Sequence, residues 1–370
     1  MKVETAILKL EERAVFALRA LYRRYGYLPY KMSRFEEYDL YVRNKDFLAS
    51  EQIITFADKS GKLLALKPDV TLSIIKNAPD VPGSVQKLYY NESVYRADAA
   101  SHTLKEIQQA GLECVGDLGS YEIAEVVLLA AKSLALLEKA FVLDISHMGL
   151  ISAVLDSCDI SPESRNAVLQ CLRQKSAHAI QDLCPGICAD AEAKLLALIN
   201  AGGPADQVLN TLKSVLTTPA EFTAFKELQD LTAILAQAGY ADSIRVDFSV
   251  GNDMKYYNGV VFKGYLEGLP SSILSGGQYD KLLQKMGRFS RAIGFALYLS
   301  MLERQNAGAG LFDLDTLILH DSTADPLTLV ALAEKASGDG SVLVTTQLPQ
   351  NRTYRQLIRV QNGEVVYEHG

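Results

Sequence analysis

The sequence predicts an α+β fold in which a sheet flanked by helices is interrupted by a helical insertion. Three patterns support this prediction. Two strand-like segments joined by a polar loop lie at 87–96 and 109–116, and a purely helical pattern runs from Ser161 to about Gly239. Strand patterns return after the helical segment, which indicates that the insertion interrupts a sheet and does not end it.

The length of the chain, 370 residues, favours two or three domains. Hydrophobic residues make up 48% of the sequence, which is enough for a sizeable globular core. We expect a main core at 1–305, with the helical insertion at about 160–240, and a small C-terminal α/β module at 306–370.

The N-terminal part is predicted to begin with an amphipathic helix. Apolar residues recur at helical spacing from Val3 to about Arg24, and Gly26 lies where such a helix would end. The elements expected after it are a strand at 52–57, a turn at 58–61, a strand at 62–67 and a helix at 72–77.

A long Ala- and Leu-rich helix is expected at 124–137, with Asp117 or Ser120 as its N-cap. Within the helical insertion, Ser161-Pro162 marks one helix start and the run Gly202-Gly203-Pro204 breaks the pattern. The remaining elements of the main core are predicted as strands at 141–146, 244–250 and 259–265, a turn at Gly276-Gly277, and a strand followed by a helix at 292–304.

The C-terminal module is predicted from a short alternation of strand and helix patterns. Its elements are a strand at 317–319, a helix after Pro326, a strand at 342–345 and a hairpin whose turn is Asn362-Gly363. A module of this size is marginal as an independent folding unit.

Composition argues against several classes of function. The net charge of −7 provides no basic footprint for nucleic acid. No apolar run reaches the roughly 18 residues that a membrane span needs, and the N-terminus lacks a signal-peptide pattern. We therefore expect a cytoplasmic protein with no nucleic-acid or membrane partner.

The five cysteines favour reduced thiols, because their number is odd and no secretory signal accompanies them. Cys184 and Cys188 are four positions apart, but no second pair of Cys or His residues matches them. We expect no metal site and no cofactor.

Arg96 is the candidate ligand-binding cation of the 87–116 strand pair. A guanidinium at a strand end, opposite carboxylate and amide side chains of the returning strand, can bind a phosphate or a carboxylate. An ion pair with Asp98 or Glu106 is the structural alternative.

Several segments together resemble class II aminoacyl-tRNA synthetases, and histidyl-tRNA synthetases in particular. The strand pair that contains Arg96 resembles motif 2, and 292–302 resembles motif 3. The segment Leu66-Lys-Pro-Asp-Val-Thr71 is similar to the amino-acid loop, while Lys255-Tyr-Tyr-Asn-Gly259 and Gly276-Gly-Gln-Tyr-Asp280 resemble later histidine-site segments. The matches occur in family order over about 1–305, and they imply an antiparallel class II sheet.

The resemblance also implies a set of residues around a bound histidine. Asp69, Thr71 and Gln109 would hold the α-amino group, while Glu113 and Tyr257 would contact the imidazole. A carboxylate suits either role, because it accepts charge-assisted hydrogen bonds. The complete set of expected histidine-binding residues is Asp69, Thr71, Arg96, Gln109, Glu113, Tyr256 and Tyr257. Asp69 and Glu113 could instead be structural carboxylates, and the tyrosines could be core residues.

The departures from the synthetase pattern concern cations. Asn252 and Met301 stand where the family has arginines, and the motif 2 loop, arginine-rich in the family, reads Ala99-Ala-Ser-His-Thr-Leu104. Adenylate formation depends on cations where negative charge develops, and losing one such group typically costs about two to three orders of magnitude in rate. We therefore expect no catalytic residues and no adenylation activity.

A histidine site without activation machinery resembles the regulatory subunits of ATP phosphoribosyltransferase. The resemblance implies a non-catalytic subunit that activates a short catalytic subunit and mediates feedback inhibition by histidine. It also implies a homodimer through the class II core, although Ser33 stands at the motif 1 proline position. A functional or divergent histidyl-tRNA synthetase and a purely structural partner, which does not sense histidine, are the alternatives.

Overall fold

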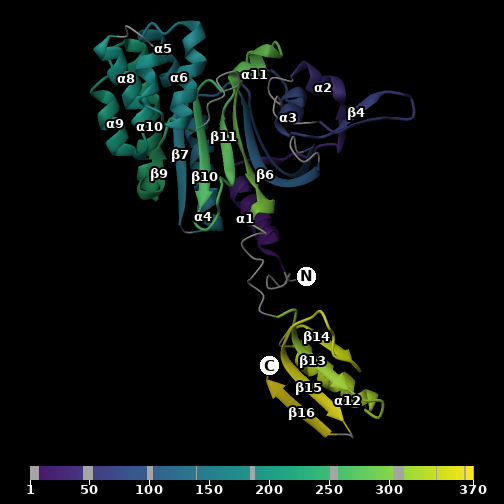
Figure 1. Ribbon diagram of the computed structural model, residues 1–370. Coiled ribbons are helices and arrows are strands. Elements are labelled where there is room, and N and C mark those ends of the chain that lie inside the picture. The colour runs from purple at the N-terminus through teal and green to yellow at the C-terminus, as the bar shows by residue number, and fades with distance from the viewer. Residues whose placement is uncertain are drawn as a thin grey trace. The chain divides into compact units, whose positions relative to one another are not determined.

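The computed structural model describes residues 8–44, 53–97, 103–138, 140–183, 188–250, 257–302, 312–338, 340–361 and 364–369. The chain divides into two compact units, Met1–Leu302 and Glu303–Gly370, and each unit has its own sheet (Figure 1).

A nine-stranded sheet forms the centre of the first unit, in the part of the chain that the structure describes. In spatial order its strands are β1 (Leu28–Pro29), β5 (Val85–Ala97), β6 (Leu104–Gly116), β12 (Arg291–Tyr298), β11 (Leu274–Gln278), β10 (Val260–Leu266), β7 (Phe141–His147), β9 (Ile244–Val246) and β8 (Gly203–Pro204). All neighbours from β5 to β7 are antiparallel, whereas β1 lies parallel to β5 and β9 lies parallel to β7. The predicted strand pair is confirmed as β5 and β6, and Arg96 lies one residue before the end of β5.

Helices α1 (Leu10–Arg24) and α4 (Ser120–Leu137) pack against one face of this sheet. Tyr22 of α1 is hydrogen-bonded to Ser133 of α4 at 3.0 Å, and its ring packs edge-on against Phe295 of β12. The predicted helix end at Gly26 is confirmed, since Gly26 has a φ of 80° that suits glycine. The predicted helix start at Val3 lies outside the described residues, and Leu8 and Lys9 are not helical.

The start of α4 differs from the prediction. The helix begins at Ser120, four residues before the predicted start, and its N-cap is Gly119. The Glu122 carboxylate accepts the backbone N–H of Gly119 at 2.8 Å, which satisfies a donor that an uncapped helix would leave unpaired. Asp117 and Ser120 are therefore not the caps.

A small three-stranded sheet and short helices lie beside the other face, near the β5 side of the main sheet (Figure 1). The elements are β2 (Phe35–Glu37), α2 (Tyr38–Arg43), β3 (Thr55–Ala57), β4 (Leu63–Leu66), α3 (Thr71–Asn77) and α11 (Asp280–Lys285). The predicted hairpin is confirmed, and Asp58 closes its turn by accepting the backbone N–H groups of Ser60 and Lys62.

The predicted helical insertion is confirmed and lies beside β7 (Figure 1). Its helices are α5 (Met148–Ser157), α6 (Pro162–Gln174), α7 (Ala179–Leu183), α8 (Ala189–Asn200), α9 (Ala205–Lys213) and α10 (Pro219–Leu235), followed by a π-helical turn at Ala236–Tyr240 and a 3-10 turn at Ala241–Ser243. Buried residues of these helices, such as Val168, Leu195 and Leu228, belong to the same hydrophobic cluster as the sheet and α4. The insertion therefore shares the core of the first unit.

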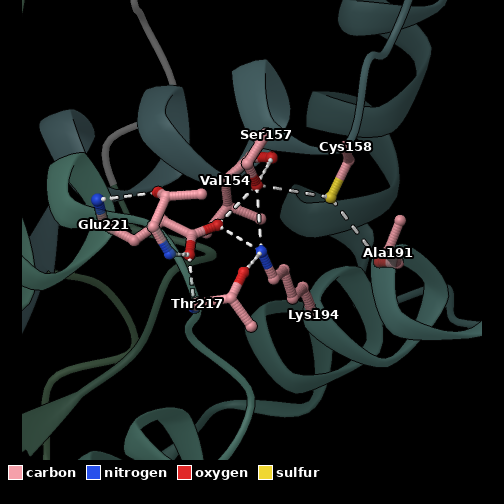
Figure 2. Close-up of polar contacts among 8 residues, drawn as sticks. Val154, Ser157, Cys158, Ala191, Lys194, Thr217 and Glu221 are labelled. Atoms are coloured by element: carbon pink, nitrogen blue, oxygen red, sulfur yellow. Dashed lines mark hydrogen bonds and ion pairs between the residues drawn. The ribbon is translucent and has the colours of Figure 1, made fainter.

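A buried ion pair joins three parts of the insertion (Figure 2). Lys194 of α8 donates to Glu221 of α10 at 2.7 Å and to Thr217 at 2.6 Å, and Ser157 of α5 also donates to Glu221. Because the Lys194 side chain is 5% exposed and the Glu221 side chain is 0% exposed, neither charge is solvated by water. The two charges depend on each other and on the hydroxyl groups around them.

Two strand predictions near the centre of the chain need correction. β9 ends at Val246 instead of residue 250, because Asp247 turns the chain by accepting the backbone N–H of Ser249 at 2.8 Å. Gly276 and Gly277 do not form a turn but lie inside β11. A Cβ atom at Gly276 would lie 2.4 Å from the Cβ of Phe295, so glycine is required there by close packing.

The predicted strand at the motif 3 position is confirmed as β12, but the described chain continues only through a 3-10 turn at Leu299–Met301 and ends at Leu302. The rest of the predicted helix lies outside the described residues. No helix in the described ranges is long and apolar enough to cross a membrane.

The second unit has the α/β pattern predicted for the tail. Its elements are β13 (Leu314–His320), α12 (Pro326–Ser337), β14 (Val342–Thr345), β15 (Tyr354–Gln361) and β16 (Glu364–His369). β13 lies parallel to both β14 and β15, whereas β15 and β16 form an antiparallel hairpin. The predicted hairpin turn at 362–363 lies outside the described residues.

Candidate functional site

The candidate site lies on the face of the main sheet opposite α1 and α4. Glu113 of β6 pairs in register with Gly294 of β12, which in turn pairs with Gly277 of β11. Side chains alternate between the two faces of a strand, so residues paired in this row share one face. Glu113 therefore stands beside two positions that have no side chain.

Glycines make the floor on which the Glu113 carboxylate rests. A Cβ atom at Gly294 would lie 1.7 Å from Glu113 Oε2, and one at Gly277 would lie 2.7 Å from the ring of Tyr257. A Cβ atom at Gly111, on the same face two residues before Glu113, would lie 2.6 Å from the Tyr90 ring. No side chain larger than hydrogen fits at these positions unless the carboxylate or the rings move.

The carboxyl group of Glu113 is held by two hydroxyl groups. Thr71, the first residue of α3, donates to Oε1 at 2.7 Å, and Tyr279, which follows β11, donates to Oε2. Glu113 is 2% exposed. Burial raises its pKa from 4.5 to about 8, against the opposing effect of these hydrogen bonds. The carboxyl group is thus largely protonated at neutral pH in the unliganded chain, and a cationic or N–H-bearing ligand that reached it would favour its ionised form.

The loops around Glu113 are positioned by Asp280. Its carboxylate accepts hydrogen bonds from Asn258 at 2.9 Å, from Gln278 at 2.7 Å and from the backbone N–H of Ala292 at 2.9 Å, while Asn258 accepts the Asp280 N–H at 2.8 Å. Asn258 follows Tyr257, so this network ties that tyrosine to β11 and β12.

Asp69 and Arg96 belong to one loop anchor near Thr71. The Asp69 carboxylate accepts the backbone N–H of Leu72 at 2.8 Å in the first turn of α3, and Arg96 Nε donates to the carbonyl oxygen of Pro68 at 3.0 Å. Burial raises the pKa of Asp69, and the backbone N–H groups of α3 and the charge of Arg96 oppose this rise. These contacts orient the loop that delivers Thr71 to Glu113.

The other expected histidine-binding residues are distributed around the same face. Gln109 is 3% exposed and lies four residues before Glu113 on β6, on the same side of the strand. Tyr257 lies over Gly277. Tyr256, Asn252 and Lys255 lie outside the described residues. The structure thus brings Thr71, Glu113 and Tyr257 around the glycine floor.

Tyr279 is the site residue that the sequence reasoning did not single out, although it lies in the segment 276–280 that resembles a histidine site. Strand alternation puts Tyr279 on the same face as Gly277, two positions earlier, but only the pairing of Gly277 with Gly294 puts that face with Glu113. Burial raises the pKa of Tyr279 well above its ordinary value, and the neighbouring Glu113 raises it further.

Of the positions where the family has cations, Arg96 is described and anchors the loop at Pro68, whereas Asn252 and residues 98–102 lie outside the described residues. Met301 is partly buried and packs against the hydrophobic core. Lys67, which is 2% exposed, is paired with Glu92 on β5, so its charge is neutralised. No cluster of three or more His, Cys, Asp or Glu side chains that could hold a metal ion occurs in the described ranges.

The raised pKa of Glu113 predicts an unusual pH dependence of stability. The folded protein retains the Glu113 proton up to about pH 8, whereas the unfolded chain releases it near 4.5, so the free energy of unfolding should fall as pH rises between these values. The slope is at most about 1.4 kcal/mol per pH unit. Urea unfolding of the wild type and of Glu113→Gln at several pH values in this range gives the difference between their free energies of unfolding. If this difference stays the same at all pH values, the prediction is wrong.

Comparisons with known proteins identify the family of this chain. A sequence model of the histidyl-tRNA synthetase family matches residues 4–302. The ATP phosphoribosyltransferase regulatory subunit of Caldanaerobacter subterraneus subsp. tengcongensis is 32% identical over 302 residues, which cover 78% of this chain and 78% of the relative.

Solved structures show the same fold. An ATP phosphoribosyltransferase regulatory subunit/histidyl-tRNA synthetase from Bacillus halodurans C superposes with a TM-score of 0.73 at 21% identity and covers 95% of this chain and 94% of its own. A chain of the ATP phosphoribosyl transferase (HisG:HisZ) complex from Thermotoga maritima superposes with a TM-score of 0.62 at 19% identity, over 78% of this chain and 97% of its own. The predicted class II fold is confirmed, and this chain belongs to the histidyl-tRNA synthetase-like family of ATP phosphoribosyltransferase regulatory subunits.

Proposed function

We propose that this chain is a non-catalytic regulatory subunit of ATP phosphoribosyltransferase in histidine biosynthesis. It activates a short catalytic subunit and makes that enzyme sensitive to inhibition by histidine. The name of the 32% identical relative and the complex in which a chain of the same fold occurs support this proposal. A cytoplasmic location and a homodimer through the first unit are part of the proposal.

The buried Glu113 carboxyl on its glycine floor carries the proposal. An imidazole N–H can take the place of a hydroxyl donor at Glu113, and the hydrogen bond to an ionised carboxyl is stronger than one between neutral groups. Thr71 and Tyr279 hold the two carboxyl oxygens, so the acceptor is already oriented. The ring of Tyr257 then offers an aromatic surface beside it.

The amino-acid end of histidine is assigned to the neighbouring polar groups. Gln109 and Asp69 supply acceptors for the ammonium group, and Arg96 supplies the cation for the carboxylate. Tyr256, which precedes Tyr257, completes the proposed set. Gln109 lies on the strand of Glu113, and Asp69 interacts electrostatically with Arg96 beside the loop that ends at Thr71, which supports this assignment.

The described cations around Glu113 are too few to stabilise the charge that develops when a carboxylate attacks ATP. Arg96 anchors the loop at Pro68, and Lys67 is neutralised by Glu92. For this reason we propose that the chain forms no aminoacyl-adenylate of its own.

Co-purification with a short-form catalytic subunit, followed by transferase assays with and without L-histidine, tests the proposal. We expect the complex to be more active than the catalytic subunit alone and to be inhibited by histidine. In the complex with Glu113→Gln, about tenfold more histidine should be needed, because a hydrogen bond to a charged group is lost. Glu106→Gln, the same change at an exposed position of β6, is the matched control and should leave inhibition unchanged.

The alternatives lead to other results in the same experiment. A functional or divergent histidyl-tRNA synthetase would catalyse histidine-dependent exchange of pyrophosphate into ATP. A purely structural partner would bind the catalytic subunit without any effect of histidine. Equal inhibition of the wild type and the Glu113→Gln complex would reject Glu113 as the histidine-binding residue.

A further inference from the structure

A cavity of about 160 Å³ lies between the first turn of α4 and helix α10 of the insertion, and we call it the α4–α10 cavity. Strand ends contribute Val260, Gln278 and Arg291 to its wall. Along its strand, each of these residues is next to a residue whose side chain lies on the face of Glu113. Because side chains alternate between the two faces, the cavity lies on the opposite face of the sheet. It is therefore separate from the proposed histidine site.

One end of the α4–α10 cavity is positively charged. The Arg291 guanidinium is held by two contacts, from Nε to Asp280 at 3.3 Å and from Nη1 to the carbonyl oxygen of Leu118 at 2.6 Å. Its Nη2 has no hydrogen-bond partner among the described residues, and the side chain is 42% exposed. Leu118 lies two residues before the start of α4, so the partial positive charge of the helix N-terminus adds to that of Arg291.

The other end is negatively charged. Glu227 and Asp230, three residues apart on α10, both line the cavity, and both side chains are more than half exposed. Asp230 is also paired with Lys226, so Glu227 is the carboxylate of the two that has no lysine or arginine partner among the described residues. Glu227 accepts a hydrogen bond from His147 Nε2 at 3.1 Å, since His147 Nδ1 accepts the backbone N–H of Leu150 and leaves the ring proton on Nε2. This hydrogen bond and the charge of Arg291 lower the pKa of Glu227, so the carboxylate stays ionised.

Opposite charges thus face each other across the cavity without an ion pair between Glu227 and Arg291. The wall between the two ends is apolar and is made by Ile123, Leu231 and Ile234 together with Val260. A ligand that satisfies both ends carries an anion and a cation that are separated by a short distance, and it has a small apolar group for the middle.

We propose that the α4–α10 cavity binds a small zwitterion, namely an α-amino acid with a short apolar side chain. Its carboxylate meets Arg291, its ammonium group meets Glu227, and its side chain packs on Leu231 and Ile234. A cavity of about 150 Å³ accommodates a molecule the size of benzene, so a ligand of roughly six to eight non-hydrogen atoms fits. L-Valine has this size and charge pattern.

Isothermal titration calorimetry of the full chain with L-valine tests the proposal, with L-histidine present at saturation. We expect one valine per chain. Isovalerate, which lacks the ammonium group, and isobutylamine, which lacks the carboxylate, should each bind about threefold more weakly, because each loses one ion pair with a partly exposed side chain. No heat of binding with L-valine at millimolar concentration, or equal binding of valine and isovalerate, would overturn the proposal.

Variants locate the binding in the cavity. Glu227→Gln should weaken valine binding about threefold, because the ion pair with this exposed carboxylate is lost, and Ile234→Trp should block binding by filling the apolar middle of the cavity. Ile234 is 42% exposed, so the larger ring can be accommodated in the folded chain, and thermal unfolding verifies this. Asp242→Asn makes the same kind of charge change on the exposed surface of the insertion and should leave binding unchanged. Unchanged valine binding in both cavity variants would assign the ligand to another site.

Discussion

Replacing Lys194 with methionine is expected to lower the free energy of unfolding by roughly 3–5 kcal/mol, because the change leaves Glu221 charged and buried without its cation. The Glu221 carboxylate also accepts the backbone N–H groups of Thr217 at 2.7 Å and Thr218 at 2.8 Å. Burial by itself would raise its pKa, but the hydrogen bonds from Lys194, Ser157 and these amides hold the pKa at about 2. Methionine removes the strongest of these donors without changing the length of the side chain much.

Urea unfolding at neutral pH measures the effect, and Lys226→Met is the matched control. Lys226 is paired with Asp230 four residues later on α10, but both side chains are more than half exposed, so the loss of that pair should cost less than about 1 kcal/mol. Similar losses for the two variants would show that the burial of the Lys194–Glu221 pair has no energetic consequence.

The pH dependence gives a second test of the same pair. The folded-state pKa of Glu221 lies below its ordinary value of 4.5, so its contribution to stability is complete above that value and is lost as pH falls toward 2. In the Lys194→Met variant this loss should be smaller, because the lysine no longer favours the ionised form. If the free energy of unfolding falls as much in Lys194→Met as in the wild type over this pH range, Lys194 is not the cause of the low pKa of Glu221.

The elements that local patterns specify were predictable from the sequence. The insertion has helical periodicity and starts at Ser161-Pro162, where the Ser161 side chain accepts the backbone N–H of Ser164. The hairpin turn at Asp58 and the helix end at Gly26 likewise depend on residues within a few positions. Such signals persist in the folded protein because tertiary contacts do not oppose them.

The errors occur where distant contacts decide the structure. Gly276-Gly277 has the local signature of a turn, but glycine is needed there because Phe295 and the Tyr257 ring crowd the strand. The α4 cap is an intermediate case, since Glu122 three residues after Gly119 is visible in the sequence as half of a capping box.

The site could be predicted only in part. Resemblance to synthetases indicated Thr71 and Glu113, which are 42 positions apart and joined by a hydrogen bond that no local pattern specifies. The place of Tyr279 beside Glu113 follows only from the register of β11 against β12. The charge pattern of the α4–α10 cavity follows only from the packing of α10 near α4. Neither relation can be read from a single sequence, because each depends on which strands and helices become neighbours.

Replacing Gly294 with alanine is expected to reduce histidine affinity by about a hundredfold, because the new Cβ takes the place of the Glu113 carboxylate. That atom would lie 1.7 Å from Glu113 Oε2 and 2.6 Å from the carbonyl oxygen of Leu112, which belongs to the sheet and cannot move aside. Glu113 must then leave Thr71 and Tyr279, so the acceptor for the imidazole is no longer oriented.

Calorimetric titration of the Gly294→Ala variant with L-histidine measures this effect, and Gly338→Ala is the control. A Cβ at Gly338 would meet only the carbonyl oxygen of Lys335 at 3.5 Å, an ordinary contact, so that variant should bind histidine as the wild type does. Overpacking in the sheet should also cost Gly294→Ala about 1–3 kcal/mol of stability, and the titration is therefore run well below the unfolding temperature. If folded Gly294→Ala binds histidine with wild-type affinity, histidine binding does not depend on the present position of the Glu113 carboxyl. The proposed site would then be wrong.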